Sequence, residues 1–286
     1  MNEYRYELLD LSTGGIREIS TLLISVFGKG SGLTDEFVDW EYNGNPVGPA
    51  VGFNAWMGEE LAAHYATQPV FAEFNGKKTR GLLSLNTATH EKHRGKKLFT
   101  LLAEKTYEYG HELGYEFVIG VANANSTPGF IKKLGFSLIC PLDVKFGIGM
   151  PANVRAVDFN YSRYWNRELL TWRLANPKLN YEIKQQEGQF VVLAPTGRYG
   201  IRAIIGSFPM ELLPPEFRVT RRKGLNPVNI WMGLDVSTIW DGKCYFNFPD
   251  RFKPSPLNLI FRDLTGMGNV PHKEEIKFMS IDFDAY

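Results

Sequence analysis

Two early segments carry apolar residues at the spacing of a helix that is buried on one face. Ile16, Ile19 and Leu23 follow one another at intervals of three and four residues, and Gly28 closes the segment. A second, shorter helix is predicted at Asp35–Tyr42, where an Asn-Gly-Asn-Pro stop follows. Both helices are expected to turn one apolar face toward a core.

Short apolar runs between turn residues predict strands that alternate with helices. In the first half the predicted strands are Val51–Met57, Leu61–Gln68, Thr79–Thr87 and Tyr115–Val121. In the second half they are Tyr181–Gln186, Gln189–Ala194, Gly200–Ser207 and Asn229–Leu234. In the first half, the strands Val51–Met57 and Leu61–Gln68 form a hairpin across a Gly-Glu-Glu turn. A helix beginning at Leu98 separates the other two strands of that half. This order, with its antiparallel start, predicts a mixed α/β fold.

The second half of the chain resembles a degraded copy of the first. Phe37–Pro46 reads FVDWEYNGNP and Leu169–Pro177 reads LLTWRLANP, so each places a Trp shortly before an Asn-Pro stop. Short strands are predicted after both segments, which favours a tandem repeat; the alternative is two unrelated helices that share an ending. A Gly- and Pro-containing stretch at Phe146–Pro151 indicates a break, and we expect domains at residues 1–149 and 150–286.

Composition is that of an ordinary globular protein, and it narrows the choice of partners. The formal net charge is +1 and charged residues make up 22% of the chain, so neither a nucleic acid nor a membrane surface is indicated. No apolar run is long enough to span a membrane, and the first residues do not resemble a signal peptide. The two cysteines have no metal-binding spacing. We therefore expect a cytoplasmic protein without a metal, of undetermined oligomeric state.

A basic turn after one of the predicted strands has the chemistry of an anion site. The segment His90–Leu102 reads HEKHRGKKLFTLL and passes from a Gly-containing turn into an amphipathic helix. Backbone N–H groups in the first turn of a helix are unpaired and favour phosphate, and Arg94, Lys96 and Lys97 add positive charge there. We expect a phosphate-bearing cofactor at this turn. No Gly-x-x-x-x-Gly-Lys-Ser/Thr motif occurs, which argues against a P-loop NTPase.

Together with a second segment, NANSTPGFIKKLGF ending at Phe136, this turn resembles the GNAT superfamily of CoA-dependent N-acyltransferases. Arg94 and Gly95 match the start of the family's Arg/Gln-x-x-Gly-x-Gly/Ala turn, although Lys97 and Phe99 replace its small residues. The second segment supplies the family's Asn, short helix and Leu-Gly-Phe ending.

The resemblance covers about residues 3–147 and implies a GNAT fold, with a central mixed sheet flanked by helices. The second half has neither an Arg-Gly turn nor the Asn and Gly-Phe ending. We therefore expect it to be a degenerate GNAT-like domain, without a second CoA site, that shapes the acceptor pocket. The resemblance also implies acyl-CoA as the acyl donor and direct attack of an amine on the thioester in a ternary complex.

The strand before the turn and the two segments supply the residues that the resemblance assigns to acyl-CoA. Backbone groups of that strand should bind the pantetheine arm, and Asn123 and Asn125 can hydrogen-bond its amides. Phe130 stands where the family often has a tyrosine that protonates the thiolate, so Ser126, water or unassisted departure must take its place. The full expected set is Leu85, Thr87, His93, Arg94, Gly95, Lys96, Lys97, Leu98, Asn123, Asn125 and Phe130.

Three residues are candidates for the catalytic chemistry. If the strand alternates regularly, Ser84 and Asn86 lie on one face, opposite Leu85 and Thr87. Ser84 or Asn86 could then face the acceptor or orient a water; the alternative is that they complete hydrogen bonds within the sheet. His64, in the preceding strand, is the residue type best suited to take a proton near neutral pH, with a structural histidine of the sheet as the alternative.

Within the family, the arrangement is most similar to N-acyltransferases of nucleotide-linked amino sugars, such as a dTDP-amino-dideoxyhexose for surface polysaccharide. Such an acceptor needs a stacking aromatic ring and cations for the diphosphate. The candidates are Tyr164, Trp165, Arg167, Arg221 and Arg222. Core aromatics and an exposed basic loop are the alternative interpretation. Another amine acceptor (a peptide N-terminus, a lysine or an aminoglycoside) and a non-catalytic acyl-CoA-binding module stay open, as do acetyl and 3-hydroxybutanoyl chains.

Overall fold

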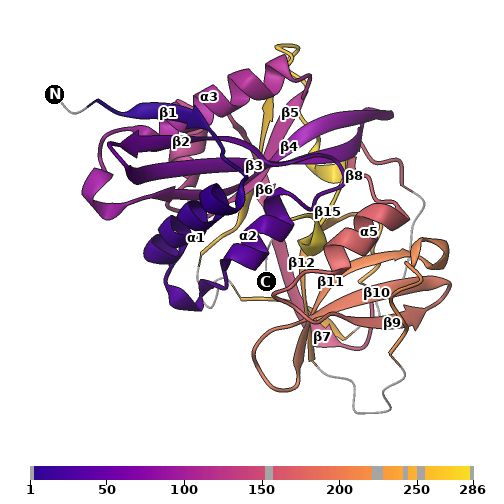
Figure 1. Ribbon diagram of the computed structural model, residues 1–286. Coiled ribbons are helices and arrows are strands. Elements are labelled where there is room, and N and C mark those ends of the chain that lie inside the picture. Colours follow the sequence, from indigo (N-terminus) through magenta and orange to yellow (C-terminus); the bar gives the residue numbers. More distant parts are fainter. Residues whose placement is uncertain (1–2, 152–156, 221–227, 241–243, 250–254, 284–286) are drawn as a thin grey trace.

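The computed structural model describes residues 3–151, 157–220, 228–240, 244–249 and 255–283. Within these residues fifteen strands join one mixed sheet, which confirms the predicted mixed α/β fold (Figure 1). The helices are α1 (Thr13–Phe27), α2 (Asp35–Tyr42), α3 (Leu98–Glu112), α4 (Thr127–Lys133) and α5 (Arg167–Leu174). The strands are β1 (Arg5–Leu8), β2 (Val51–Met57), β3 (Glu60–Phe74), β4 (Lys77–Thr89), β5 (Phe117–Ala122), β6 (Ser137–Pro141), β7 (Asp143–Ile148), β8 (Tyr161–Arg163), β9 (Glu182–Gln186), β10 (Gln189–Pro195), β11 (Ile201–Pro209), β12 (Val228–Asp235), β13 (Tyr245–Asn247), β14 (Asn258–Asp263) and β15 (Ile276–Met279).

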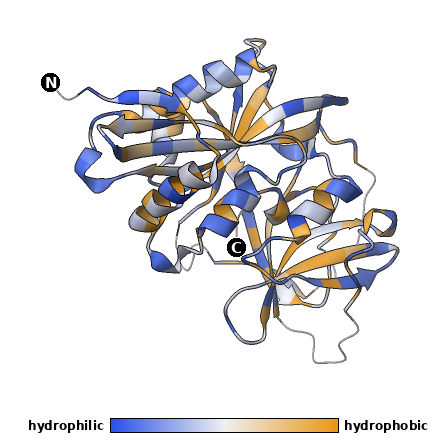
Figure 2. Cartoon of the chain, in the orientation of Figure 1, coloured by the Kyte–Doolittle hydropathy of each residue, from blue (hydrophilic) through white to orange (hydrophobic). Residues whose placement is uncertain are grey.

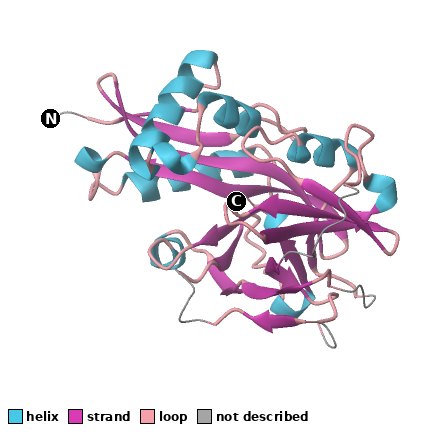
Figure 3. Ribbon diagram, turned by 90° about the horizontal axis from the view of Figure 1, so that it is seen from below, coloured by secondary structure: helices cyan, strands magenta, loops and turns pink. Residues whose placement is uncertain are grey.

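Capping side chains explain where α1 and α2 begin. The Ser12 side chain accepts a hydrogen bond from the N–H of Gly15, and the Thr34 side chain accepts one from the N–H of Phe37. The apolar faces of both helices are buried in one cluster, whereas α3 packs in a separate cluster with β2, β3 and β5. Both early helices are therefore confirmed, and Figure 3 shows most helical segments on one side of the strands.

β4 begins beside β5 and then leaves it. The parallel pairing runs from Gly81 opposite Phe117 to Ser84 opposite Gly120, whereas β4 continues to Thr89. Among the strands that the structure describes, only β14 pairs with β5 beyond Gly120. The two strands therefore form the sides of a V that opens toward their carboxyl ends.

A bulge in β4 lies inside this split. Leu85 pairs with Ala66 and Thr87 pairs with Tyr65, so Asn86 is the extra residue, at a φ of 37°. Asparagine adopts a positive φ more readily than most residues. The sequence therefore places a suitable residue at the strained position.

This bulge corrects the prediction that Ser84 and Asn86 share a face. The Ser84 hydroxyl is hydrogen-bonded to Tyr65, in the cluster covered by α3. The Asn86 side chain donates a hydrogen bond to Glu41 of α2, on the opposite face. One inserted residue is enough to break the regular alternation of a strand.

The second half repeats the order of elements in the first. α5 is followed by the antiparallel strands β9, β10 and β11 and then by β12, parallel to β11, just as α2 is followed by β2, β3, β4 and the parallel β5. The β11–β12 pairing also stops early, at Ile204 opposite Trp231, and the β10–β11 register shifts there, leaving Ile205 as the extra residue. The predicted tandem repeat is confirmed.

The two tryptophans that suggested the repeat contact each other. The Trp40 and Trp172 rings stack with centroids 5.0 Å apart at 18°. Each indole Nε1 donates a hydrogen bond of 3.1 Å to the backbone oxygen of the other tryptophan. Because each helix gives and receives the same contact, α2 and α5 are related by an approximate two-fold axis.

The repeats exchange their last strands. β7, from the first half, pairs with β12 and β13, whereas β14, from the second half, pairs with β5 and β6. β7 accordingly lies among strands of the second half in Figure 1. The boundary predicted at 149/150 falls in the connection after β7, but strands cross it in both directions. The halves are repeats in sequence without being separable units in the sheet.

β15 fills the space that β11 leaves beside β12. Gly233 of β12 pairs with Asp143 of β7 on one side and with Met279 of β15 on the other. β15 therefore lies on the side where β11 had paired with β12 as far as Trp231. β8 then connects β15 to the far end of β3, which makes the sheet continuous.

A shared core supports the join between the halves. One buried cluster combines Leu83 and Phe117 of the first half with Met232, Phe261 and Phe278 of the second. In Figure 2 hydrophobic residues concentrate on the strands that cross the middle of the molecule. Among the described residues, no helix is long and apolar enough to cross a membrane.

Candidate active site

A cavity of about 470 Å³ occupies the split between β4 and β5. It is lined by residues of β4, β5, the following loop, α3, α4 and the end of α1. Seven residues that the sequence assigned to catalysis or to acyl-CoA line it, namely Ser84, Leu85, Asn86, Thr87, Asn123, Asn125 and Phe130. The remaining lining residues are Phe27, Phe99, Val121, Ser126 and Gly129.

The backbone of this split can pair with an extended ligand. After Ser84 on β4 and Gly120 on β5, the two strands no longer bond to each other. Strand edges present N–H and C=O groups that recruit another extended chain. A ligand that carries amides along a flexible arm can therefore lie in the split as an additional strand would.

The loop after β5 is shaped by Asn123. Its Oδ1 accepts hydrogen bonds of 3.0 Å from the backbone N–H groups of Asn125 and Ser126. The oxygen predicted to bind the cofactor thus holds the turn that leads into α4. The Asn125 side chain lines the same cavity and is the better placed amide for a ligand.

Phe130 forms part of an aromatic wall. Its ring packs edge-on against Phe99 at 5.2 Å and against Phe136 at 5.1 Å between centroids. Since phenylalanine has no hydroxyl, a proton donor must come from another side of the cavity.

A hydroxyl network that the sequence did not reveal ends at the cavity. The Tyr65 hydroxyl lies 2.7 Å from Ser84 Oγ and 2.5 Å from the Tyr107 hydroxyl. Burial raises the pKa of Tyr65 to about 12, and burial also raises the pKa of Tyr107 well above its ordinary value. Both tyrosines are therefore protonated at neutral pH, and Ser84 is the member that lines the cavity.

Glu41 is a second group that sequence patterns missed. It lies on α2, is only 3% exposed, and accepts a hydrogen bond from Asn86 Nδ2. Because of the bulge, the Asn86 side chain connects the cavity to the buried carboxylate of Glu41. No local signal marks Glu41, because its importance depends on the extra residue in a strand that follows it by 45 positions.

His64 does not line this cavity. It is fully buried, with Nε2 2.8 Å from the Tyr42 hydroxyl and Nδ1 2.7 Å from Asn54 Oδ1. Burial lowers its pKa to about 3. A histidine enclosed in this way cannot reach an acceptor amine, so the geometry does not support its predicted role as general base.

The predicted phosphate turn leads into α3. Gly95 has a φ of 79° and Lys97, which precedes the helix, has a φ of 60°. In the part of the chain that the structure describes, no side chain caps the helix start. Arg94, Lys96 and Lys97 are exposed, so their charges and the free end of the helix face the same solvent. Leu98 is different, because its side chain is buried in the core and only its backbone could meet a phosphate.

The His93 side chain is buried and contacts other residues of the protein, so it does not point toward solvent. Its ring is buried, with Nδ1 2.8 Å from the Tyr4 hydroxyl and Nε2 3.5 Å from Glu60 Oε2. The geometry therefore does not support the predicted phosphate contact of this side chain.

The described residues assigned to the acceptor, Tyr164, Trp165 and Arg167, are not among those that line the cavity. The ring of Tyr164 lies under Lys78 Nζ at 3.8 Å, Trp165 Nε1 donates to Asp282 Oδ1 at 2.8 Å, and Arg167 donates to a backbone oxygen. The Tyr164 contact joins the two halves, whereas the other two lie within the second half. Arg221 and Arg222 lie outside the described residues.

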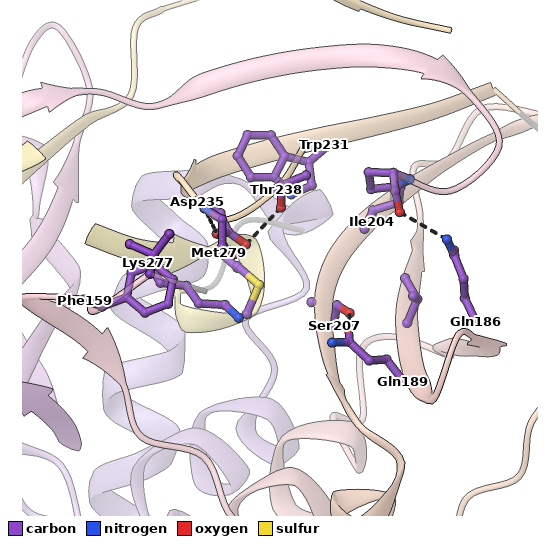
Figure 4. Close-up of a pocket in the computed structure, with 15 residues that line it drawn as sticks. Phe159, Gln186, Gln189, Ile204, Ser207, Trp231, Asp235, Thr238, Lys277 and Met279 are labelled. Atoms are coloured by element: carbon purple, nitrogen blue, oxygen red, sulfur yellow. Dashed lines mark hydrogen bonds between the residues drawn. The ribbon is translucent and has the colours of Figure 1, made fainter. Parts of the chain in front are cut away.

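A smaller cavity of about 210 Å³ lies at the corresponding place in the second half. Lys277 and Met279 of β15 lie on one side of it, facing Ser207 of β11 and Gln189 of β10 on the other (Figure 4). Because β15 is paired with β12 here, the second split has no free β12 edge of the kind found on β5.

Comparison with known proteins identifies the first half. Residues 10–139 match the acetyltransferase (GNAT) domain. No curated protein matches the sequence. The chain is similar in structure to a probable N-acyltransferase from Enterococcus faecalis V583 (TM-score 0.60, 10% identity, 92% of this chain and 73% of that one).

Two further structures share the fold. Eis1 from Mycobacterium abscessus matches with a TM-score of 0.60 at 11% identity over 92% of this chain and 74% of that one. N-myristoyltransferase of Saccharomyces cerevisiae, with bound myristoyl-CoA, matches with a TM-score of 0.51 at 11% identity over 73% and 63%.

Residues 10–139 thus form a GNAT domain, the class of domain that the split sheet and the basic turn define. The protein is an acyl-CoA-dependent N-acyltransferase, and acyl-CoA is its acyl donor. The predicted enzyme class and donor are confirmed.

Proposed function

We propose that acyl-CoA lies across the first half of the chain, with its diphosphate at the start of α3 and its pantetheine arm between β4 and β5. The observation that carries the proposal is the open split, whose β4 side leads along the chain to the exposed cations at Arg94, Lys96 and Lys97. Free strand edges suit the amides of pantetheine, and the helix start suits a diphosphate.

The acceptor amine attacks the thioester carbonyl carbon directly in this proposal. The new C–N bond forms, the C–S bond breaks, and sulfur leaves as a thiolate that gains a proton while the amine nitrogen loses one. Ser84, backed by the protonated Tyr65 and Tyr107, is the hydroxyl placed to donate toward the sulfur. Glu41, reached through Asn86, is the carboxylate that can accept the amine proton by way of water.

For the acceptor we propose a nucleotide-linked amino sugar, which would place the enzyme in surface polysaccharide synthesis in the cytoplasm. The family resemblance supports this choice. The residues first assigned to the nucleotide give no added support, because Tyr164, Trp165 and Arg167 are engaged elsewhere. An aminoglycoside, a peptide N-terminus or a lysine is the alternative acceptor.

A thiol-release assay tests both parts of the proposal. Purified protein is given acetyl-CoA or 3-hydroxybutanoyl-CoA with dTDP- and UDP-linked amino sugars, an aminoglycoside or an N-terminal peptide. Release of CoA that requires a nucleotide amino sugar is the expected result. Release with only another amine overturns the acceptor, and CoA binding without release on any acceptor overturns the catalytic role.

Charge reversal separates the donor site from the acceptor site. Arg94→Glu should raise the KM for acyl-CoA at least tenfold with little change in the KM for the amine. Lys77→Glu, exposed at the opposite end of β4, is the matched control and should change neither. An equal change in both KM values for Arg94→Glu would argue against the turn as the diphosphate site.

A further inference from the structure

Two histidines and a glutamate converge beside the phosphate turn. Glu60 begins β3, and His90 and His93 flank a short 3-10 turn after β4. One ligand-type atom from each residue lies within 4.8 Å of the others. In a 3-10 turn, residues three apart point to the same side, which explains why His90 and His93 face Glu60 together.

The contacts in this cluster are longer than ordinary hydrogen bonds, and the His93–Glu60 contact lies at the limit of hydrogen-bond distance. Glu60 Oε1 lies 3.8 Å from His90 Nδ1, and Oε2 lies 3.5 Å from His93 Nε2. His90 Nδ1 is buried and has no hydrogen-bond partner among the described residues. A buried polar atom without a partner is unfavourable and calls for an unrecorded one.

The distances suit three atoms that share one metal ion. Ligand atoms at about 2.1 Å from a tetrahedral zinc ion lie roughly 3.4 Å from one another. The two carboxylate–imidazole separations, 3.8 Å to Oε1 and 3.5 Å to Oε2, are close to that value, and one atom from each of the three residues lies within 4.8 Å of the others. The half-exposed Glu60 side chain can move the short remaining distance.

The second nitrogen of His93 is already held as metal-binding histidines usually are. Its Nδ1 lies 2.8 Å from the Tyr4 hydroxyl, an arrangement that fixes the ring and directs Nε2 at Glu60. Tyr4 also packs edge-on against the His93 ring, at 5.7 Å between centroids.

We propose that Glu60, His90 and His93 bind a divalent zinc ion through a carboxylate oxygen, Nδ1 and Nε2 respectively. Two imidazoles and one carboxylate form a set that zinc accepts with a further position left to water or a ligand. That position is accessible, because Glu60 and His90 also line a cavity of about 440 Å³ between α1 and the β2–β3 hairpin.

The ion would connect the β2–β3 hairpin to the turn that precedes α3. His93, one of the three proposed ligands, directly precedes Arg94, which begins the basic turn. We therefore expect zinc to hold that turn in place and to tighten CoA binding. This consequence rests on the proposed function, whereas zinc binding itself does not.

Zinc binding is measured on tag-free, chelator-stripped full-length protein by competition with a chromogenic chelator. The Cys244→Ser background removes the exposed thiol as a competing ligand. One equivalent of zinc should bind, and thermal unfolding should shift upward with added zinc. Glu60→Gln and His90→Ala should each weaken binding at least tenfold, and Tyr4→Phe about tenfold.

His111→Ala is the matched control, since His111 is exposed on α3 away from the cluster, and it should bind zinc as the parent does. Absence of zinc binding, or binding that Glu60→Gln leaves unchanged, overturns the site. Circular dichroism will show whether Glu60→Gln unfolds the protein. If it does, the zinc affinity of His90→Ala is the result that decides whether the site exists. Zinc binding without any change in CoA affinity would refute only the coupling.

Discussion

The contact between Trp40 and Trp172 makes a quantitative prediction about how the repeats are joined. Replacing either residue by leucine removes one indole hydrogen bond, part of the buried ring area and the ring stack. The backbone oxygen of residue 40 still accepts a hydrogen bond from the N–H of Gly44, and that of residue 172 still accepts one from the N–H of Ala175. Neither oxygen is therefore left without a donor.

The cost of each single substitution follows from these losses. The hydrogen bond contributes about 1 kcal/mol, the lost buried area about 1 kcal/mol and the stack about 1 kcal/mol. Each variant should therefore lose about 3 kcal/mol in the free energy of unfolding. The double variant loses the shared stack only once, so it should lose about 5 kcal/mol rather than about 6.

Urea unfolding followed by far-ultraviolet circular dichroism measures these free energies without depending on tryptophan fluorescence. The pair Trp40→Leu and Trp231→Leu is the matched control, because Trp231 lies in a different buried cluster, and its effects should add. If the effects of Trp40→Leu and Trp172→Leu also add, the two indoles do not act as a coupled pair and the reasoning fails.

Three further predictions concern His64, the strand exchange and the bulge. Burial lowers the pKa of His64 to about 3 from 6.5, so the unfolded state binds the extra proton between these values and stability should fall as pH falls through that window. In pH-dependent urea titrations His64→Gln should flatten this slope by up to about 1.4 kcal/mol per pH unit, whereas His111→Gln should not. A fragment of residues 1–149 lacks β14, so limited proteolysis should find it unfolded alone and protected when co-expressed with residues 150–286; protection of the fragment alone would contradict the exchange. At the positive φ of Asn86, Asn86→Val should lower the melting temperature more than Asn86→Gly does, and the reverse order would argue against the bulge.

Local patterns were sufficient to predict the early helices, eight of the fifteen described strands and the GNAT domain. The apolar spacing that begins at Ile16 defined α1, and the Asn-Pro endings near Trp40 and Trp172 revealed a repeat that the structure shows as a reciprocal contact. These features depend on neighbouring residues, which a sequence displays directly. The same is true of the basic turn at Arg94.

Features that depend on pairing between distant strands were not predictable in this way. Strict alternation put Ser84 and Asn86 on one face, but a single inserted residue separates them. The hydroxyl chain through Tyr65 and Tyr107 joins residues 42 positions apart, and neither carries a motif. The assignment of His64 failed for a related reason, since residue type says nothing about enclosure by Tyr42 and Asn54.

The exchange of β7 and β14 between the repeats could not be predicted from composition either. A Gly- and Pro-containing stretch correctly marks an irregular connection, but it does not show which sheet the flanking strands join. For the proposed zinc site, the cysteines gave no metal spacing, and the sequence feature that corresponds to the site is the His-x-x-His spacing at His90 and His93. Glu60, the third member of that cluster, is supplied by another strand.

Calorimetric titration with acetyl-CoA and with CoA tests most directly the claim that the open split between β4 and β5 is the donor site. One molecule should bind per chain, because β15 occupies the equivalent position in the second half. Gly129→Leu, which projects into the first cavity beside Phe99, should weaken binding at least tenfold, whereas Ser207→Leu in the second cavity should not. Two molecules per chain, or an affinity that responds to Ser207→Leu and ignores Gly129→Leu, would contradict the account.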